Sequence, residues 1–407
     1  MLMTSVCSYA TSENKTMMID GYERTYILYT PSTYNDTTDY PVLVLLHPMG
    51  FNATDFSEIS SPQAICDLNN AIVVFPEALD EQDEEILNIY SILSDRGKLP
   101  DGFHVNNVWG AGTRIQYSKI EQMAGNAAML LPFLMPKAKA AGYAELNKNI
   151  DDVKFINEVI NELQTSYHAN TDIFVVGASL GGAMTYKYAF SPNSKAKKIG
   201  VVHGFLSAGT DTTPAINIPL CVFHSQADGI VKYDGGLFNE SIPDDVHSYA
   251  MKIGCDSTYT EEQLPDTKED GISIKYRQYT SSDTTQFVWF YIADNATHFD
   301  ILNAEKNDID YVTIIEKFLF FTPTIRNMDD VKETPNIQVA IYPNPTQDYL
   351  HCTARGSYEI IDMAGRIQKE GEVAEDGTIN LTSIPPQEFI FVLKIGNLIK
   401  KVRLVKK

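Results

Sequence analysis

One five-residue pattern in the chain can present a reactive serine. A Gly-x-Ser-x-Gly sequence runs from Gly177 to Gly181, with Ser179 at its centre. A nucleophilic serine at a sharp strand-to-helix turn needs neighbours without side chains, so that its hydroxyl projects clear and the helix can pack close. The apolar run Ile173 to Val176 precedes the pattern, and the helix-like run Ala183 to Phe190 follows it. The sequence therefore predicts a nucleophilic Ser179 at a strand-to-helix turn.

A nucleophilic serine also needs a histidine base and an acid that orients the base. Where the serine sits at such a turn, both partners follow it in the order acid, then histidine, on loops after later strands. The apolar run Pro219 to Phe223 leads to Asp228, and the apolar run that ends at Ile292 leads to His298. We therefore predict a catalytic triad of Ser179, Asp228 and His298.

Other residues downstream of Ser179 compete for these two roles. The rivals are Asp211 and Asp234 for the acid and His203, His224, His247 and His351 for the base. A loop aspartate is usually a turn former, and an isolated histidine is usually a surface or core residue. His203 and His224 lie at the ends of predicted strands, which favours structural roles for both.

The oxyanion of an acyl-transfer reaction needs two backbone N–H donors. The N–H of Leu180, the residue after the nucleophile, is the first. The second is expected from the loop after the apolar run Pro41 to Leu46, where Pro48 has no N–H to donate and Met49 does. We predict Met49 and Leu180 as the donors and assign His47 as a structural anchor of the loop.

These residues require a scaffold of alternating strands and helices. Continuous apolar runs are typical of parallel strands buried on both faces. The predicted strands are Pro41–Leu46, Ala71–Phe75, Ile173–Val176, Lys198–His203 and Pro219–Phe223, with hairpins at Met17–Tyr29 and Ile272–Ile292 and helices at Asp151–Gln164, Ala183–Phe190 and Tyr311–Phe320. The fold class predicted is α/β, with a doubly wound, mostly parallel sheet.

A long segment, residues 77–149, interrupts this alternation before the nucleophile strand. It contains Trp109, one of only two tryptophans in the chain. Long insertions in compact domains are usually functional or disordered. The segment is therefore either an extra packed layer or a lid over the acyl pocket, with Trp109 lining that pocket.

The character of the chain changes near residue 321. Residues 322–337 contain prolines and mixed charges without periodicity and are predicted to be a linker. Residues 338–407 hold 9 Lys and Arg against 8 Asp and Glu, although the whole chain carries a net charge of −21. Their short, turn-punctuated apolar runs predict a small, sandwich-like all-β domain after a catalytic domain at residues 17–321.

Composition excludes several classes of function. The net charge of −21 disfavours a nucleic-acid or anionic-membrane surface, and no apolar run reaches transmembrane length. The five cysteines form no Cys-x-x-Cys pair, so no metal site, cofactor or disulfide framework is predicted, although one disulfide is possible after export. Residues 1–16 form an N-terminal segment, of which Met1 to Ala10 could be the remnant of a signal peptide.

Several stretches together resemble a known family. They are Tyr22–Pro31, Pro41–Phe56, Asp151–Phe155, Gly177–Gly182 and His224–Tyr233. As a set they look like the secreted polyhydroxybutyrate depolymerase and feruloyl/acetylxylan esterase family of α/β-hydrolases. The resemblance implies hydrolysis of carboxylic esters through an acyl-serine, and it puts the predicted triad and both oxyanion donors at the family's own positions. Pro48, in place of the usual glycine, and the long insertion depart from the family pattern.

The C-terminal residues resemble a different family. Ile341–Leu350, Tyr358–Arg366 and Ile399–Lys407 look like the sorting domain of the type IX secretion system of the Bacteroidota, although the usual Gly-x-Tyr near Pro386–Ile390 is missing. The resemblance implies passage through the type IX secretion machinery, and a secreted or cell-surface location. A carbohydrate-binding or adhesive β-module is the alternative.

Together these patterns predict a secreted serine esterase that acts on feruloyl or acetyl esters of plant polysaccharide. A polyhydroxybutyrate-type polyester depolymerase and a prolyl-oligopeptidase-like peptidase would use the same triad. A catalytically inactive surface binding protein is the alternative outside the enzyme class. Turnover of an ester, lost in Ser179→Ala, separates the enzymes from the binding protein.

Overall fold

The computed structural model describes residues 12–99, 102–264, 266, 270–299, 309–320, 341–342, 346–353, 355–362, 367–374, 377–395 and 398–407. The predicted signal-peptide remnant and the predicted linker lie outside the described residues. The chain divides into two compact units, and the larger one contains Asn35–Pro323 together with the preceding Thr11–Pro31. The smaller one contains Thr324–Lys407. Each unit is described separately below.

The larger unit is built on one ten-stranded sheet. Its strands are β1 (Ser12–Ile19), β2 (Tyr22–Tyr29), β3 (Tyr40–Leu46), β4 (Ile72–Pro76), β7 (Ala169–Ala178), β8 (Ala196–Val202), β9 (Leu220–Ser225), β10 (Tyr259–Gln263), β11 (Ile274–Thr280) and β12 (Phe287–Ala293). They lie in the order β1-β2-β4-β3-β7-β8-β9-β12-β11-β10. The six central strands, from β4 to β12, are parallel neighbours, and antiparallel hairpins form both edges. The predicted doubly wound, mostly parallel sheet is confirmed.

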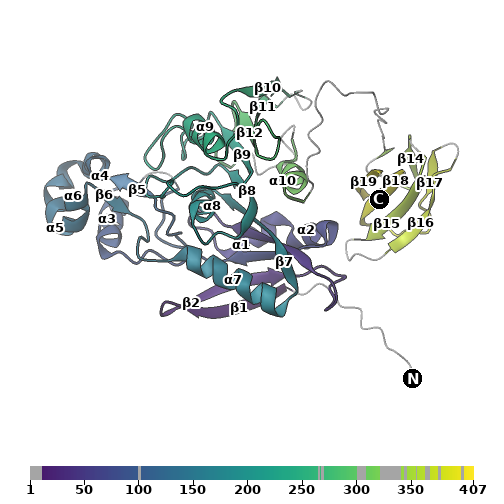
Figure 1. Cartoon of the computed structure of the whole chain (residues 1–407), viewed down its shortest axis with the longest axis horizontal. Coiled ribbons are helices and arrows are strands. Elements are labelled where there is room, and N and C mark those ends of the chain that lie inside the picture. Colours follow the sequence, from purple (N-terminus) through teal and green to yellow (C-terminus); the bar gives the residue numbers. More distant parts are fainter. Residues whose placement is uncertain are drawn as a thin grey trace. The chain divides into compact units, whose positions relative to one another are not determined.

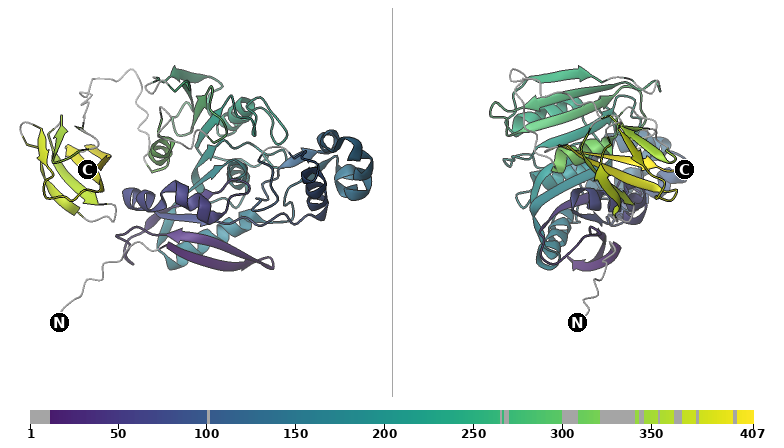
Figure 2. Two further views of the ribbon diagram at one scale, coloured as in Figure 1. Left: turned by 180° about the vertical axis from the view of Figure 1, so that it is seen from behind. Right: turned by 90° about the vertical axis from the view of Figure 1, so that its right-hand side faces the viewer.

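Helices cover both faces of this sheet (Figures 1 and 2). The helices α1 (Ala53–Ser60), α2 (Pro62–Asn69) and α10 (Tyr311–Phe320) share one face, and α7 (Asp152–Ser166), α8 (Leu180–Phe190) and α9 (Ile242–Lys252) share the other. α7 has the predicted amphipathic spacing, and the Asp151 side chain caps its first turn by accepting from the N–H of Lys154. α1, α2 and α9 are not among the predicted helices. α1 and α2 are only 8 residues long, whereas α9 does bury Ile242, Val246, Tyr249 and Ala250 at helical spacing.

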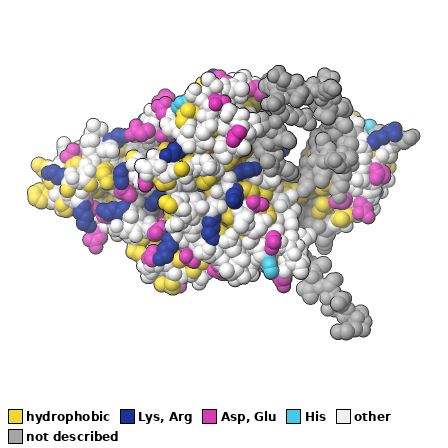
Figure 3. Space-filling model, viewed as in Figure 1, with side chains coloured by type: hydrophobic (Ala, Val, Ile, Leu, Met, Phe, Trp, Pro, Cys, Tyr) yellow, Lys and Arg dark blue, Asp and Glu magenta, His cyan; other side chains and the backbone are white. Residues whose placement is uncertain are grey.

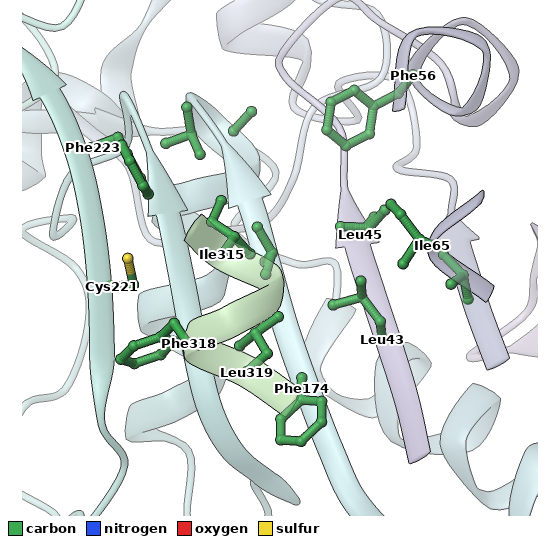
Figure 4. Packing of buried hydrophobic residues seen from close by; sticks show 14 of the residues in the cluster. Leu43, Leu45, Phe56, Ile65, Phe174, Cys221, Phe223, Ile315, Phe318 and Leu319 are labelled. Atoms are coloured by element: carbon green, nitrogen blue, oxygen red, sulfur yellow. The ribbon is translucent and has the colours of Figure 1, made fainter. Parts of the chain in front are cut away.

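On the face covered by α10, buried apolar side chains of the central strands pack against the helix (Figure 4). Leu43 and Leu45 alternate along β3, and Phe174 projects from β7 to the same face. Phe318 and Leu319 of α10 pack into this cluster and are almost fully buried. α10 therefore closes one face of the central parallel strands.

The segment between β4 and α7 folds into its own small subdomain. It contains α3 (Glu84–Ser94), β5 (Arg114–Gln116), α4 (Tyr117–Ala124), the 3₁₀ helix η1 (Gly125–Leu130), α5 (Leu131–Leu134), α6 (Pro136–Ala141) and β6 (Tyr143–Glu145). β5 and β6 pair as an antiparallel ribbon. Pro132 and Pro136 each lie in the first turn of a short helix, where a missing N–H costs nothing.

The tip of this subdomain exposes large apolar side chains. Met129 and Phe133 have 75% and 83% of their surface accessible. Figure 3 shows hydrophobic side chains at the left end of the molecule, where Figure 1 places α5. Such a cluster is uncommon on a soluble surface and is typical of a contact site.

The smaller unit is all-β. Its strands are β13 (Ile341–Tyr342), β14 (Tyr349–Cys352), β15 (Ser357–Asp362), β16 (Ile367–Glu372), β17 (Thr378–Asn380), β18 (Glu388–Ile395) and β19 (Leu398–Val405). They form a three-stranded sheet, β13-β14-β17, and a four-stranded sheet, β16-β15-β18-β19. Leu350 and Ile379 of the first sheet share a buried core with Ile360 and Phe391 of the second. The predicted small sandwich is confirmed.

The cysteines within the described residues are all free and buried: Cys66, Cys221, Cys255 and Cys352. The disulfide that export would permit is therefore not formed among these four. No helix in the described ranges has the length and apolarity needed to cross a membrane.

Candidate active site

Ser179 occupies the turn between β7 and α8. Its backbone has φ 53° and ψ −119°, a strained conformation for a residue with a side chain, and its N–H donates to the carbonyl of Val202 at 2.8 Å. A Cβ added at Gly177 would lie 2.1 Å from the carbonyl oxygen of Gly181, and one added at Gly181 would lie 2.1 Å from that of Leu46. The glycines are therefore required for the close approach of α8 to β7 and β3, as the pattern predicts.

Asp228 and His298 meet at the carboxyl edge of the parallel strands. Asp228 follows β9, His298 follows β12, and these two strands are parallel neighbours. The Nδ1 of His298 lies 2.7 Å from Oδ2 of Asp228. The other oxygen, Oδ1, accepts from the N–H groups of Ile230 and Val231, each at 2.9 Å. The structure thus brings together the acid and the base that the sequence predicts.

The rival residues have other partners, with two exceptions. Asp211 binds Thr213 in an exposed turn, and Asp234 is exposed. His247 packs against Tyr279, and His351 lies in the smaller unit beside Thr378. His203 and His224 are the exceptions, because both lie next to Asp228.

His203 binds the same carboxylate oxygen as His298. Its Nδ1 is 2.6 Å from Oδ2 of Asp228. His224 directs Nε2 to the carbonyl of Val231 at 2.8 Å, and this nitrogen is 3.6 Å from Oδ2. Asp228 is therefore surrounded by three histidines. A structural role is predicted for His203 because it lies at the end of a strand, and the structure adds a direct contact with the predicted acid.

Two of these buried groups, Asp228 and His224, have defined charges. Burial raises the pKa of Asp228, but the hydrogen bonds from His203 and His298 outweigh it and hold that pKa well below its ordinary value. Burial lowers the pKa of His224 to about 3, so its ring is neutral. His203, His224 and Asp228 offer ligand atoms within 4.8 Å of one another. The 2.6 Å separation of His203 from Asp228 is that of a direct hydrogen bond, which leaves no room for an ion between these two atoms.

The protonation of His298 follows from its partner. An ionised carboxylate only accepts hydrogen bonds, so Nδ1 of His298 carries a proton and donates it to Asp228. In the neutral form of the ring, Nε2 then has the lone pair that a general base needs. Within the described residues, Ser179 Oγ makes no hydrogen bond and His298 makes only the one to Asp228. A serine–histidine bond that closes only with substrate present is common in ligand-free hydrolases.

A small cavity adjoins the serine. Its lining residues are Met49, Gly102, Thr113, Ser179, Leu180, Phe205, Ile230, Val231 and Phe238. Its volume of about 20 Å³ holds about one water molecule. Leu180 is the first residue of α8, so its N–H has no partner within the helix. Met49 and Leu180 thus both line the space beside Ser179, which is where oxyanion donors are needed.

Trp109 does not line this space, and the predicted pocket role is wrong. Its side chain is fully buried, and its Nε1–H donates to the carbonyl of His47 at 2.9 Å. The Nε2 of His47 in turn accepts from the N–H of Ala78 at 3.1 Å. Trp109 therefore supports the loop that carries Met49 through its hydrogen bond to His47. His47 itself is buried and anchors the loop, as the sequence predicts.

An open groove continues from the cavity. Lys119, Gln122 and Met123 of α4 form one wall, and the loop at residues 229–240 forms the other. Ile230 and Phe238 line both the groove and the small cavity. Lys119 bridges the walls by donating to the carbonyl of Gly236. The insertion therefore shapes one side of a groove, of about 810 Å³, that adjoins the serine.

The strand order and the placement of the three residues define the fold as that of an α/β-hydrolase: the serine follows β7, the acid β9 and the histidine β12.

No family model matches the chain. In sequence it is similar to a protein of Aspergillus clavatus named probable feruloyl esterase C, with 28% identity over 138 residues, or 34% of this chain and 45% of that protein. The protein of the same name from Aspergillus niger is 27% identical over 160 residues, which cover 34% of this chain and 56% of that protein. The chain spans about half the length of the curated relatives it matches.

Two solved structures also match the chain, at lower identity. An acetyl xylan esterase from Aspergillus awamori matches with a TM-score of 0.44 and 13% identity, over 76% of this chain and 99% of that one. A CE1 ferulic acid esterase from Anaeromyces mucronatus matches with a TM-score of 0.39 and 11% identity, over 79% and 93%.

Proposed function

We propose that the protein is a serine carboxylic ester hydrolase that acts on acyl esters of plant polysaccharide, feruloyl or acetyl. The observation that carries this proposal is the hydrogen bond of 2.7 Å between His298 and Asp228, at the sheet edge that also holds the strained Ser179. The similarity to proteins named feruloyl esterase supports the substrate class.

The proposed reaction proceeds in two acyl transfers. Ser179 Oγ attacks the ester carbonyl carbon while Nε2 of His298 takes the hydroxyl proton, and Asp228 stabilises the imidazolium that forms. The N–H groups of Met49 and Leu180 stabilise the oxyanion. When the C–O bond breaks, His298 returns the proton to the departing alcohol. Water, deprotonated by His298, then attacks the acyl carbon. As the bond from this carbon to Ser179 Oγ breaks, His298 returns the proton to Oγ, which releases the acid and restores the serine.

The two cavities suggest where the parts of the substrate bind. The space beside Ser179 is small, and most of its lining side chains are apolar, which suits the acyl carbonyl and its first carbons. The groove beyond it carries Lys119, Gln122 and Asp234, and polar side chains of this kind suit the hydroxyl groups of a sugar. We therefore place the polysaccharide along α4 and the loop at residues 229–240.

A panel of three substrates tests the substrate class: methyl ferulate, acetylated xylan and polyhydroxybutyrate, each assayed for acid release with the wild-type protein and Ser179→Ala. We expect turnover of methyl ferulate or acetylated xylan by the wild type alone. Turnover of polyhydroxybutyrate alone would instead favour the polyester depolymerase, for which the exposed Met129 and Phe133 would be an adsorption surface. Failure of all three substrates would refute the proposed substrate class.

We further propose that the smaller unit is an export signal for the type IX secretion machinery, so that the enzyme is secreted or held at the cell surface of a Bacteroidota-type bacterium. The resemblance of Ile341–Leu350, Tyr358–Arg366 and Ile399–Lys407 to such a sorting domain supports the proposal. The unit has its own buried core, which makes it suitable for transfer to another protein. A reporter fused to residues 338–407 and expressed in such a bacterium should appear outside the cell. Retention of the reporter, together with its capture by xylan, would support a carbohydrate-binding module instead.

A further inference from the structure

The carboxylate of Asp228 has all its acceptor positions filled. Oδ1 accepts two backbone N–H groups, from Ile230 and Val231, and Oδ2 accepts one imidazole N–H each from His203 and His298. An ionised carboxylate has about four such positions. The proposed base, His298, therefore occupies only one of these four acceptor positions. His203 occupies a second position, on the same oxygen.

His203 is fixed in place by the fold. It follows β8 directly, its N–H donates to the carbonyl of Phe223 on β9 at 2.8 Å, and its side chain is 2% exposed. Its backbone has φ 50°, in the left-handed region that few non-glycine residues adopt. A buried histidine held in this conformation keeps its Nδ1 directed at Asp228.

The titratable groups around His203 come from several elements. Asp228 and His224 belong to β9 and the loop after it, and His298 follows β12. The His203 ring lies 5.1 Å from the His224 ring and 5.2 Å from the His298 ring, between centroids. Tyr233 faces His224 from the far side, at 6.2 Å. His203 thus lies where it can influence the acid and the base together.

We propose that His203 is a positioning residue of the triad: it holds Oδ2 of Asp228 and limits how strongly that oxygen stabilises protonated His298. A carboxylate oxygen that accepts two hydrogen bonds offers less negative charge to each donor than one that accepts a single bond. Loss of the His203 hydrogen bond should therefore strengthen the bond between Asp228 and protonated His298. This inference rests on the proposed serine hydrolase function.

Two substitutions of His203 test the proposal. In His203→Leu the donor is lost, so Asp228 should bind protonated His298 more strongly, and the acidic limb of the pH profile of kcat/KM should move up by about 0.5–1 unit. In His203→Asn the amide N–H can replace Nδ1–H, and asparagine tolerates the left-handed backbone, so the limb should stay at the wild-type pH. The assay is p-nitrophenyl acetate hydrolysis from about pH 5 to 9.

A second readout does not depend on ester turnover. A fluorophosphonate labels an activated serine directly, so its rate of reaction with Ser179 across the same pH range should show the same displacement in His203→Leu. Unchanged limbs in His203→Leu would overturn the proposal, and so would a displacement of equal size in His203→Asn. If His203→Leu does not fold, as judged by circular dichroism, His203→Ala takes its place.

The alternative that His203 is the base has its own outcome. His298→Leu should then retain most of the labelling of Ser179, and His203→Leu should lose it. Labelling of the wild type without turnover of any ester would refute the proposed function but leave the pH test of His203 intact. Absence of labelling in the wild type would overturn both.

Discussion

Replacement of Ser179 by alanine is expected to lower kcat for ester hydrolysis by about 10⁴–10⁶-fold, which is the usual effect of removing the nucleophile of a triad. The change deletes one hydroxyl that makes no hydrogen bond among the described residues, and alanine meets the same backbone strain at φ 53°. We therefore expect the melting temperature to stay close to that of the wild type. Hydrolysis of p-nitrophenyl acetate and thermal unfolding measure the two effects.

Ser166→Ala is the matched control for this prediction. Ser166 is exposed at the end of α7 and does not belong to the turn that carries Ser179. The substitution therefore removes the same chemical group, a serine hydroxyl, from a different element. Its activity should equal that of the wild type within about twofold, as for other surface substitutions. A Ser179→Ala protein that keeps more than about one hundredth of the wild-type rate would place the nucleophile elsewhere.

Replacement of Asp152 by alanine is expected to lower the free energy of unfolding by about 3–5 kcal/mol, the usual cost of leaving a buried charge unpaired. Arg24 Nη2 lies 2.6 Å from Oδ1 of Asp152, and their side chains are 2% and 0% exposed. Oδ2 accepts from the N–H of Gly110 at 2.7 Å, and Arg24 also donates to the carbonyl of Glu77. The pair therefore joins β2, the insertion and the start of α7.

Asp151→Ala is the control for this second prediction. Asp151 is the exposed neighbour of Asp152, and its side chain only caps α7, so its loss should cost about 1 kcal/mol. In a double variant, Arg24→Met with Asp152→Leu, both charges are removed, and much of the lost stability should return. Urea unfolding measures all three. Equal losses for Asp151→Ala and Asp152→Ala would show that the buried pair contributes little.

The Arg24–Asp152 pair also bears on how the insertion serves the site. Gly110 is bound by Asp152, and the preceding Trp109 is bound to the loop of Met49 through His47. The base of the insertion is thus fastened both to the sheet and to one of the proposed oxyanion donors. These contacts favour the view that residues near Trp109 are a rigid support, whereas α4 is the part that borders the groove.

Features whose causes lie within a few residues along the chain could be predicted from the sequence. The elbow at Ser179 follows from Gly177 and Gly181, because a Cβ at either position would come within 2.1 Å of a backbone carbonyl oxygen. The central strands follow from continuous apolar runs, since a parallel strand buried on both faces has no polar side to show. Asp228 and His298 could be predicted because each directly follows such a strand.

The contacts between residues on different strands became known from the tertiary structure. His203 and His298 are far apart in sequence, and they share one oxygen of Asp228 only because β8 and β12 are the two neighbours of β9. Trp109 looked like a pocket residue, and its burial beneath His47 depends on how the insertion returns to the sheet. Local patterns specify turns and strands because their causes lie within a few residues. The order of strands in a sheet is set by packing over the whole domain, which no single stretch of sequence contains.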